Sequence, residues 1–166
     1  FRCNANDLLS GEEIIFKNGS LAKALRCSSS IPSIFSPVYD NKQLLVDGGV
    51  SNNLGTDIAK KLGADIIIAV DASSYSKERD DITDVFDVLS QSIQFNSLKK
   101  KKENIKLSTI LIEPKLNYKQ SMDFDEKSLS EMYQSGYNAI YKNIESLVKI
   151  KNDLPPTYKN DNNVKL

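Results

Sequence analysis

The sequence predicts an α/β domain built around a mainly parallel central sheet. Segments with strand-like and helix-like hydrophobic patterns alternate along the chain, and turn residues separate them. The continuous apolar run over 66–70 is typical of a strand covered on both faces, as in parallel sheets. The 166 residues, 40% of them hydrophobic, are enough for one core. We expect a domain over 1–150 and a linker or disordered tail over 151–166.

Five strands are predicted from short apolar runs that end at turn residues. Ser10 and Gly11 turn the first strand into the second, Asn18 and Gly19 close the second, and Pro114 stops the last. The predicted strands cover 1–6, 14–17, 43–46, 64–73 and 108–112. Between them, the segment SSSIPSIFSPV over 28–38 is rich in serine and proline, which favours an ordered loop anchored by buried Ile31 and Phe35 side chains.

Four helices are predicted from apolar residues at helical spacing. Ser20 stands at the N-cap of the first helix, and Gly63 ends the second as a C′ glycine. The predicted helices cover 21–27, 56–62, a segment from Asp80 or Thr83 that fades into KKKKEN at 99–104, and 126–149. The side chains expected to face inward are Ile58, Ala59 and Leu62; Ile82, Val85, Phe86, Leu89 and Ile93; and Leu129, Met132, Tyr133, Tyr137, Ile140, Ile144 and Leu147.

Composition argues against several classes of function. The 22 basic and 22 acidic residues balance, so no overall field attracts nucleic acid, and no nucleic-acid partner is expected. Cys3 and Cys27 are too few for a disulfide framework, and with no histidine in the chain a metal centre is not expected. We expect two buried thiols and no cofactor. No apolar run reaches the roughly 18–20 residues that a transmembrane helix needs.

The segment LLVDGGVSNNLG over 44–55 is the most distinctive part of the sequence. Its glycines fit neither GxGxxG nor GxxxxGK[ST], so it is not a phosphate-binding loop. Two interpretations remain. In the first, Asp47 caps its own turn, Gly48 and Gly49 supply positive φ, and Asn52 and Asn53 satisfy loop amides. In the second, Asp47 is a catalytic carboxylate on a sharp turn that follows a strand.

Two longer stretches favour the second interpretation. DLLSGEEIIFKNGSLAKALRCSSSIPSIFSPV and LLVDGGVSNNLGTDIAKKLGADIIIAVDAS together resemble the second half of the bacterial patatin-like phospholipase domain. The resemblance is close over about 1–75 and looser beyond. Asn6, Cys27 and Gly55 depart from residues common in that family. The resemblance implies the C-terminal portion of a three-layer αβα domain, with its mainly parallel central sheet, over 1–150.

The resemblance also implies a chemistry, the hydrolysis of lipid acyl esters by a serine and an aspartate without histidine. Asp47 matches the aspartate of the DGG motif and is the candidate catalytic residue. A nearby carboxylate can orient a serine hydroxyl and accept its proton, and Gly48 and Gly49 let the backbone turn without Cβ atoms in the way. The chain contains no GxSxG motif, so we expect the serine to lie outside it. The expected partners are a phospholipid or another acyl-ester lipid and, transiently, a membrane surface.

Other polar residues have a structural and a functional interpretation. Asp7 and Asp71 end strands and either cap turns or orient site loops. Lysines 99–102 are expected to form a solvated helix end, the alternative being a contact with anionic lipid headgroups. Ser28, Ser29, Ser30 and Pro32 end a helix or line an acyl pocket. For the whole chain, the alternative to an enzyme is a non-catalytic patatin-like binding or scaffolding domain of a larger protein.

Overall fold

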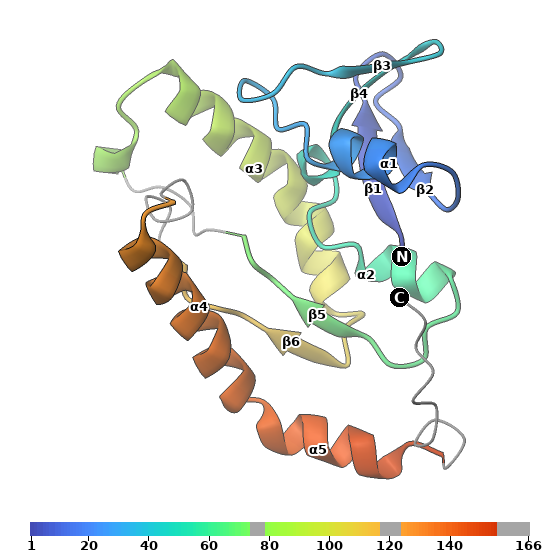
Figure 1. Ribbon diagram of the computed structural model, residues 1–166, viewed down its shortest axis with the longest axis vertical. Helices are drawn as coiled ribbons and strands as arrows, with labels where there is room; N and C mark the ends of the chain where they lie inside the picture. The colour runs from blue at the N-terminus through green and yellow to red at the C-terminus, as the bar shows by residue number, and fades with distance from the viewer. Residues whose placement is uncertain (74–78, 117–123, 156–166) are drawn as a thin grey trace.

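The computed structural model describes residues 1–73, 79–116 and 124–155, and it contains two separate sheets surrounded by helices (Figure 1). The strands are β1 (Cys3–Asp7), β2 (Glu13–Phe16), β3 (Val38–Asp40), β4 (Gln43–Asp47), β5 (Ile68–Val70) and β6 (Ile110–Ile112). The helices are α1 (Leu21–Ser28), α2 (Thr56–Lys61), α3 (Val85–Ile105), α4 (Glu126–Tyr141) and α5 (Ile144–Asp153). Two short 3-10 turns are η1 (Gly48–Val50) and η2 (Arg79–Asp81). Mixed α/β content is therefore confirmed.

The larger sheet is antiparallel, and this corrects the prediction of a mainly parallel sheet. Its order is β2-β1-β4-β3, and every neighbouring pair is antiparallel. Short connections explain the direction of two of these pairs, β1 with β2 and β3 with β4. A short turn joins β1 to β2, and Asn41 and Lys42 alone join β3 to β4, whereas parallel neighbours need a crossover of a dozen or more residues. Asn41 has a φ of 55°, which suits asparagine in so tight a turn.

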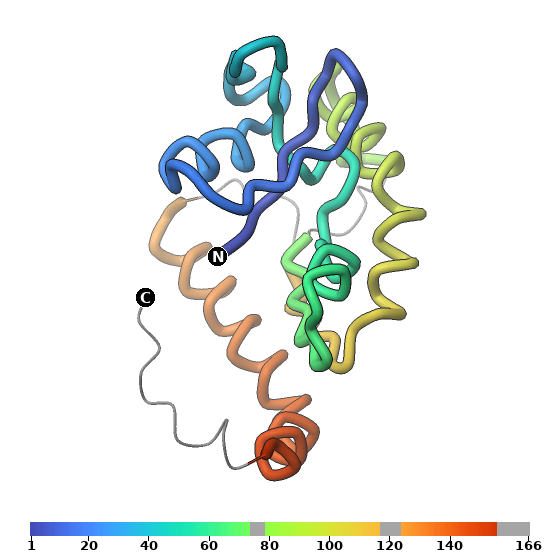
Figure 2. The backbone as a smooth tube through the Cα atoms, turned by 90° about the vertical axis from the view of Figure 1, so that its right-hand side faces the viewer, coloured from blue at the N-terminus to red at the C-terminus, as the bar shows by residue number. Residues whose placement is uncertain are grey.

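The smaller sheet contains the two parallel strands β5 and β6, joined by a crossover that includes α3. Ile110 and Ile112 of β6 form a core cluster with Ala139 of α4. In Figure 2 this sheet lies between α3 and α4. The three-layer αβα arrangement of a complete domain stays a prediction.

The expectation that the run over 66–70 is covered on both faces is wrong. Ile67 and Ala69 are buried, but Ile68 and Val70 are 48% and 54% exposed. Parallel partners share one face, so Ile68 and Val70 lie on the face where α4 covers β6. Helix α4 does not extend its cover to β5, and one face of β5 stays open.

The second core cluster sits between α1 and the antiparallel sheet, where Ala5, Cys27 and Leu45 are fully buried. Cys27 is thus a buried thiol, as predicted, whereas Cys3 is only half-buried; both are free. The Ser20 cap is confirmed by a bond from the Lys23 N–H to the Ser20 hydroxyl (3.3 Å). Gly63 has a φ of 91°, as a C′ glycine requires.

Two helices differ from their predicted extents. Helix α3 begins after Asp84 and continues to Ile105, through the lysine segment where fading was expected. The helix predicted over 126–149 is two helices, because the Asn143 side chain donates to the Ala139 carbonyl (3.0 Å) and so competes with the backbone ladder. Helix α5 reaches Asp153, inside the predicted tail, and residues 156–166 of that tail lie outside the described residues.

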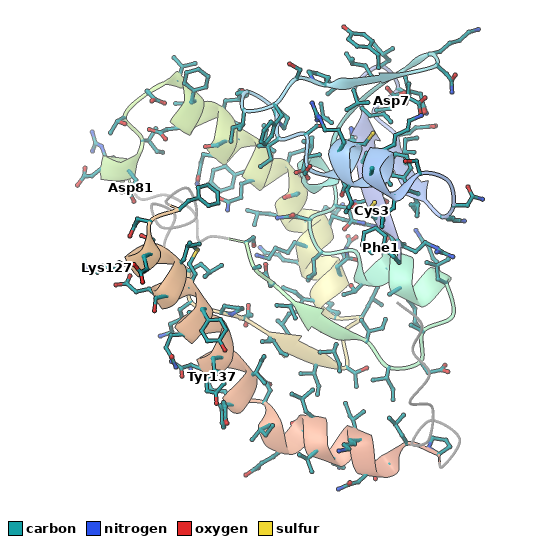
Figure 3. The ribbon with its side chains drawn as sticks, in the orientation of Figure 1. Phe1, Cys3, Asp7, Asp81, Lys127 and Tyr137 are labelled. Carbon is teal, nitrogen blue, oxygen red and sulfur yellow. The ribbon has the colours of Figure 1, made fainter. Side chains whose placement is uncertain are left out.

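Several predicted core positions are exposed. Phe35 is 51% exposed, and the Arg26 guanidinium lies over its ring (5.9 Å from the ring centroid). On α4 the exposed tyrosines contact one another: Tyr137 and Tyr141 join their hydroxyls at 3.0 Å. Figure 3 shows Tyr137 on the opposite side of the molecule from Asp7. The other predicted core residues found exposed are Ile31, Leu62, Ile82, Val85, Phe86, Leu89, Leu129, Tyr133, Ile140 and Ile144. Strand β3 was not predicted. Its first residue, Val38, is the last residue of the loop predicted over 28–38, and its other two residues follow that loop.

No helix within the described ranges has both the length and the apolar character needed to cross a bilayer.

Candidate active site

Asp47 lies where the chain leaves β4 and enters η1, and two hydrogen bonds fix it there. Its backbone N–H donates to the Ser30 carbonyl (3.0 Å), and its Oδ1 accepts from the Gly49 N–H (2.7 Å). Asp47 is therefore the N-cap of η1, with extended backbone angles of −49° and 131°. The first interpretation, in which Asp47 caps its own turn, therefore describes the geometry correctly. The cap uses Oδ1 and leaves the second carboxylate oxygen available.

Gly48 and Gly49 are needed for close approach rather than for positive φ. Neither has φ in the left-handed region, so that expectation is wrong. A Cβ on Gly48 would lie 2.4 Å from Cγ of Asn4, and one on Gly49 would lie 2.8 Å from Oδ1 of Asn53. The second contact near Gly49 is Oδ1 of Asp47 at 3.0 Å. Gly49 therefore keeps a Cβ atom away from the Asp47 carboxylate, and Gly48 leaves room for the Asn4 amide beside the turn.

Burial raises the pKa of Asp47, and the hydrogen bond from the Gly49 amide offsets this in part. Within the part of the chain that the structure describes, that amide is the one donor to the carboxylate, and no cation pairs with it. A carboxylate with a raised pKa is a better proton acceptor than a solvated one.

Asp47 opens into a cavity of about 660 Å³ between β4, the 31–34 loop and α3. The apolar lining includes Ile31, Pro32, Ile34, Val50, Phe86, Leu89 and Ile93, and the polar lining near the carboxylate includes Gly49 and Asn53. Three of the α3 residues predicted to face the core, Phe86, Leu89 and Ile93, line this cavity instead, which explains why Phe86 and Leu89 are exposed; Val85 is exposed outside it. An apolar cavity with one carboxylate at its wall suits a hydrocarbon chain attached to a polar, reacting group.

Four serines line the cavity, and none within the described residues donates to Asp47. The Ser73 hydroxyl donates to Asp71 (2.5 Å), Ser90 to the Asp87 carbonyl (3.0 Å) and Ser97 to the Gln94 carbonyl (3.0 Å). Ser33, the fourth, is in the left-handed region with a φ of 73°. The described part of the chain therefore holds a proton acceptor without a hydroxyl in position.

Asn52 and Asn53 have different roles in the loop. Asn52 is 3% exposed, and its side-chain amide donates to Glu13 (2.8 Å) and to Asp57 (3.0 Å). Asn53 is exposed and lines the cavity. Asn52 thus joins the loop to β2 and α2, a stronger role than the satisfied loop amide that was predicted.

The other strand-end aspartates divide between the two roles considered for them. Asp7 accepts from the Leu44 N–H (2.9 Å) and the Ser10 hydroxyl (2.8 Å), and the Leu44 bond in particular lowers its pKa. It is a turn residue. Asp71 pairs with Lys101 (2.5 Å) and accepts from Ser73, so it holds the Ala72–Ser73 wall of the cavity. Although burial raises the pKa of Asp71, these bonds bring it below its usual value.

The lysine segment is not a uniformly solvated helix end. Lys100 pairs with Asp57 (2.8 Å) and Lys101 with Asp71 (2.5 Å), whereas Lys99 and Lys102 are exposed. The prediction of a solvated helix end is right for Lys99 and Lys102 and wrong for Lys100 and Lys101. Since Lys100 and Lys101 are engaged within the chain, they are poor candidates for a headgroup contact.

The serine-rich helix end combines both of its interpretations. The Ser29 hydroxyl donates to the Leu25 carbonyl (2.9 Å) and the Ser30 hydroxyl to the Arg26 carbonyl (2.6 Å), which ends α1. Pro32 lines the cavity. Ser30 is also fully buried, and its carbonyl holds the Asp47 backbone, a contact that no sequence signal indicated.

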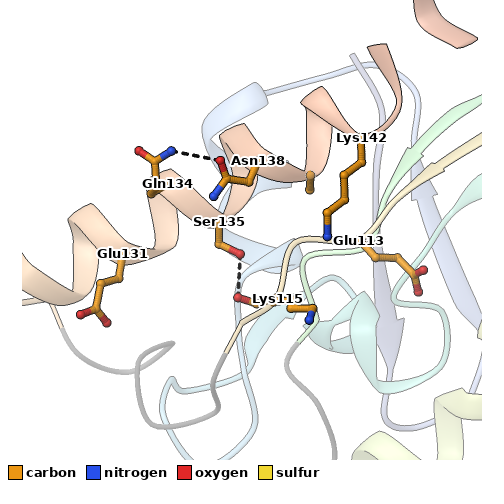
Figure 4. Close-up of a pocket in the computed structure, with 8 residues that line it drawn as sticks. Glu113, Lys115, Glu131, Gln134, Ser135, Asn138 and Lys142 are labelled. Carbon is orange, nitrogen blue, oxygen red and sulfur yellow. Dashed lines mark hydrogen bonds between the residues drawn. The ribbon is translucent and has the colours of Figure 1, made fainter. Parts of the chain in front are cut away.

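A second cavity, of about 630 Å³, lies beside α4 and is lined mainly by charged and polar residues (Figure 4). Its charged residues are Glu113, Lys115, Glu131 and Lys142, and its one hydroxyl, that of Ser135, donates to the Lys115 carbonyl (2.7 Å). Ala139 is the one apolar residue among those that line it. The Asp47 cavity is therefore the stronger candidate. No cluster able to hold a metal ion occurs among the described residues.

Comparison with known proteins points to one family for the first part of the chain. Residues 4–60 match the family model described as patatin-like phospholipase. This range contains Asp47, Gly48 and Gly49. It also contains the 31–34 loop, but α3 lies beyond it.

Similar curated proteins carry related names. An uncharacterized NTE family protein of Mycobacterium tuberculosis is 46% identical over 52 residues, 31% of this chain and 9% of that protein. Patatin-like phospholipase domain-containing protein 7 of Mus musculus is 36% identical over 51% of this chain and 6% of its own length. Lysophospholipase NTE1 of Phaeosphaeria nodorum is 33% identical over 47% of this chain and 5% of its own length.

The matched region spans less than a tenth of the length of these relatives. The matches support the patatin-like family for this part of the chain.

Proposed function

We propose that this chain contributes the aspartate of a serine–aspartate dyad in a lipid acyl hydrolase, with the serine outside the chain. One observation carries the proposal: the Asp47 carboxylate, whose pKa burial raises, opens into a largely apolar cavity of about 660 Å³. The similarity of residues 4–60 to patatin-like phospholipases supports the same chemistry.

In this proposal Asp47 accepts the proton of the serine hydroxyl as the hydroxyl attacks the ester carbonyl. The Gly49 N–H holds one carboxylate oxygen, so the other is presented to the serine. Gly49 supports the site by keeping a Cβ atom away from the carboxylate, and Gly48 supports it by admitting the Asn4 amide beside the turn. Dyad chemistry needs neither a metal nor a cofactor.

The substrate follows from the cavity. Phe86, Leu89 and Ile93 form an apolar wall that suits an acyl chain, and the carboxylate marks the position of the ester. We therefore propose a phospholipid or another acyl-ester lipid as substrate, taken during transient contact with a membrane surface. The chain would be the C-terminal portion of a three-layer αβα domain.

The test is ester hydrolysis by the longest form of the protein that its gene encodes, with long-chain acyl esters as substrate. Asp47→Asn should lower hydrolysis by roughly 10²–10⁴-fold, because asparagine cannot accept the proton. Asp80→Asn, a matched change at an exposed position of η2, should leave it unchanged. Full activity in Asp47→Asn would refute the dyad.

The alternative is a non-catalytic binding domain, and one observation favours it: no hydroxyl within the described residues donates to Asp47. A serine-reactive fluorophosphonate separates the two functions. Covalent labelling of the protein, together with hydrolysis, supports the enzyme. Lipid binding with neither labelling nor hydrolysis supports the binding domain.

A further inference from the structure

We propose that three side chains on one face of α3, Asn96, Lys100 and Asn104, act as positioning residues that hold the cavity wall of α3 over Asp47. We call them the α3 ladder. The three are spaced four residues apart and therefore lie in one row along the helix. The inference deepens the proposed function and rests on it for the role of the cavity.

Each member of the ladder contacts the segment that follows Asp47. The Asn96 amide donates to the Val50 carbonyl in η1 (3.0 Å). The Lys100 ammonium pairs with Asp57 in α2 (2.8 Å). The Asn104 amide donates to Oδ1 of Asn52 (2.7 Å) and to the Leu54 carbonyl (2.6 Å). The three side chains thus contact the loop at η1, at the start of α2 and at the Asn52–Leu54 segment between them.

The C-terminal end of the ladder is buried. Asn104 is 0% exposed, and its backbone carbonyl accepts from the Thr56 hydroxyl (2.6 Å). Its Oδ1 is one of three buried side-chain polar atoms with no hydrogen-bond partner within the described residues. A buried asparagine with an unsatisfied oxygen costs stability, so its two donated bonds must be worth more than an apolar contact here.

Helix α3 reverses the usual burial pattern, and Asn104 of the ladder is one of its buried residues. Gln91, Ser97 and Asn104 are the buried residues of the helix, whereas Phe86 and Leu89 are exposed to the cavity. An apolar face would hold α3 by non-directional contacts, which tolerate sliding. Hydrogen bonds have narrow ranges of distance and angle, so three of them in a row fix both the rotation and the axial position of the helix.

The two halves of α3 are mechanically linked because the helix is continuous from Val85 to Ile105. Leu89 and Ile93 on the cavity wall precede Asn96 by seven and three residues, roughly 10 Å and 5 Å along the axis. Releasing the ladder would therefore let this wall move away from Asp47. Water would then enter beside the carboxylate. The cavity would also select less strictly for the length of the acyl chain.

The first experiment does not depend on the proposed function. The Asp47 carboxyl is titrated by carbon-detected NMR in the 166-residue chain and in six variants. In Asn104→Ala and Asn96→Ala, which change no charge, the Asp47 midpoint should fall toward that of a solvated aspartate. Ser92→Ala, an exposed α3 position bonded only within its own helix, should leave it unchanged. Asn96→Ala removes a surface bond and keeps the test open if Asn104→Ala does not fold.

Lysine variants separate position from charge. Removing a positive charge would by itself raise the midpoint of the Asp47 titration. Displacement of the α3 wall would lower it, because water would then reach the carboxylate. Lys100→Met should therefore lower the midpoint, and Lys100→Arg, which keeps the pair with Asp57, should restore it. Lys99→Met at an exposed neighbouring position is the matched control. Unchanged midpoints in Asn96→Ala, Asn104→Ala and Lys100→Met would overturn the ladder.

A second experiment tests the link to acyl selection, with ester substrates of increasing chain length and the full protein. Lys100→Met should reduce the preference between the best and the next chain lengths roughly tenfold, and Lys100→Arg should keep it. If the wild-type protein hydrolyses no ester, the proposed function fails, and the NMR titration still decides whether the ladder positions the wall. If selectivity is unchanged in Lys100→Met, the ladder has no role in specificity.

Discussion

At the scale of single residues, the site depends on how close neighbouring groups can come. Asp47 is held by one backbone amide and one carbonyl, and neighbouring asparagine side chains approach the two glycines that follow it too closely for a Cβ atom. Gly48 shows the constraint most clearly, because the whole Asn4 amide group lies where its Cβ would be. Asn4 cannot simply turn away, since it donates to Glu13 (2.9 Å) and to the Asn52 carbonyl (3.0 Å).

Gly48→Ala is therefore expected to destabilise the protein by about 1–3 kcal/mol, the usual cost of forcing an extra methyl group into a packed site. The matched control is Gly136→Ala in α4, where an added Cβ meets nothing within 4 Å. That change should stabilise by roughly 0.5–1 kcal/mol, because alanine is the better helix former. Urea denaturation measures both. A neutral Gly48→Ala would show that Asn4 can move at little cost.

At the scale of elements, the ends of the helices follow local signals, whereas their burial does not. The Asp84 side chain accepts from the Asp87 N–H (2.8 Å), and the Asp87 side chain accepts from the Asp84 N–H (3.2 Å), a capping box that begins α3. The same helix then presents apolar residues to a cavity and polar residues to a loop. The apolar spacing of this segment correctly predicted a helix. It wrongly predicted which face of the helix is buried.

Asp84→Ala is expected to cost about 1 kcal/mol of stability, because it removes the acceptor for one of the otherwise unpaired amides of the first turn. Since the cap lies beside Phe86 on the cavity wall, the first turn of α3 should also lose amide protection in hydrogen exchange. Asp80→Ala in η2 is the control. Equal stability and protection in the two variants would contradict the capping role.

At the scale of the whole molecule, a polar interface joins the two sheets. Thr56, Asp57 and Asn52 on one side meet Lys100 and Asn104 of α3 on the other, and α3 leads into β6. Burial raises the pKa of Asp57, but bonds from Lys100, Asn52 and Lys61 outweigh it and bring the pKa well below its usual value. Asp47 has the opposite shift, so the two carboxylates should give stability an opposite dependence on pH.

The pH dependence separates these two aspartates. The pKa of Asp57 is lowered by folding, so its contribution is present above the unfolded value of about 3.9 and is lost as pH falls below it. Asp57→Asn should therefore destabilise at pH 7 and have a diminishing effect toward pH 2. The pKa of Asp47 is raised, so its charged form opposes folding as pH rises. Asp47→Asn should stabilise at pH 7 and have no effect below about pH 4.

Thermal unfolding of the two variants between pH 2 and pH 7 checks both expectations. The wild-type chain is the reference at each pH. A constant difference across the range for either variant would mean that its effect comes from packing and not from ionisation. Loss of stability at pH 7 in Asp47→Asn would show that the charged form is the favoured one.

The sequence by itself determined features that depend on a few neighbouring residues. The Ser20 cap, the Gly63 terminus, the start of α2 and the chain reversal at Ser10 and Gly11 were predictable, because each is a local hydrogen bond or a local φ preference. Asp47 could be singled out by the DGG motif and its resemblance. Its protonation behaviour could not, since that depends on burial by distant segments.

Tertiary structure decided the direction of the larger sheet, the face that α3 buries and the cavity beside Asp47. The contacts responsible join residues far apart in the chain: Asn96 reaches Val50 across 46 positions and Asn104 reaches Asn52 across 52. The spacing of apolar residues indicates that a helix has an apolar face. It does not indicate whether that face packs against a core or lines a cavity. In this protein, the polar contacts of α3 with residues far away in the sequence determine that its apolar face lines a cavity.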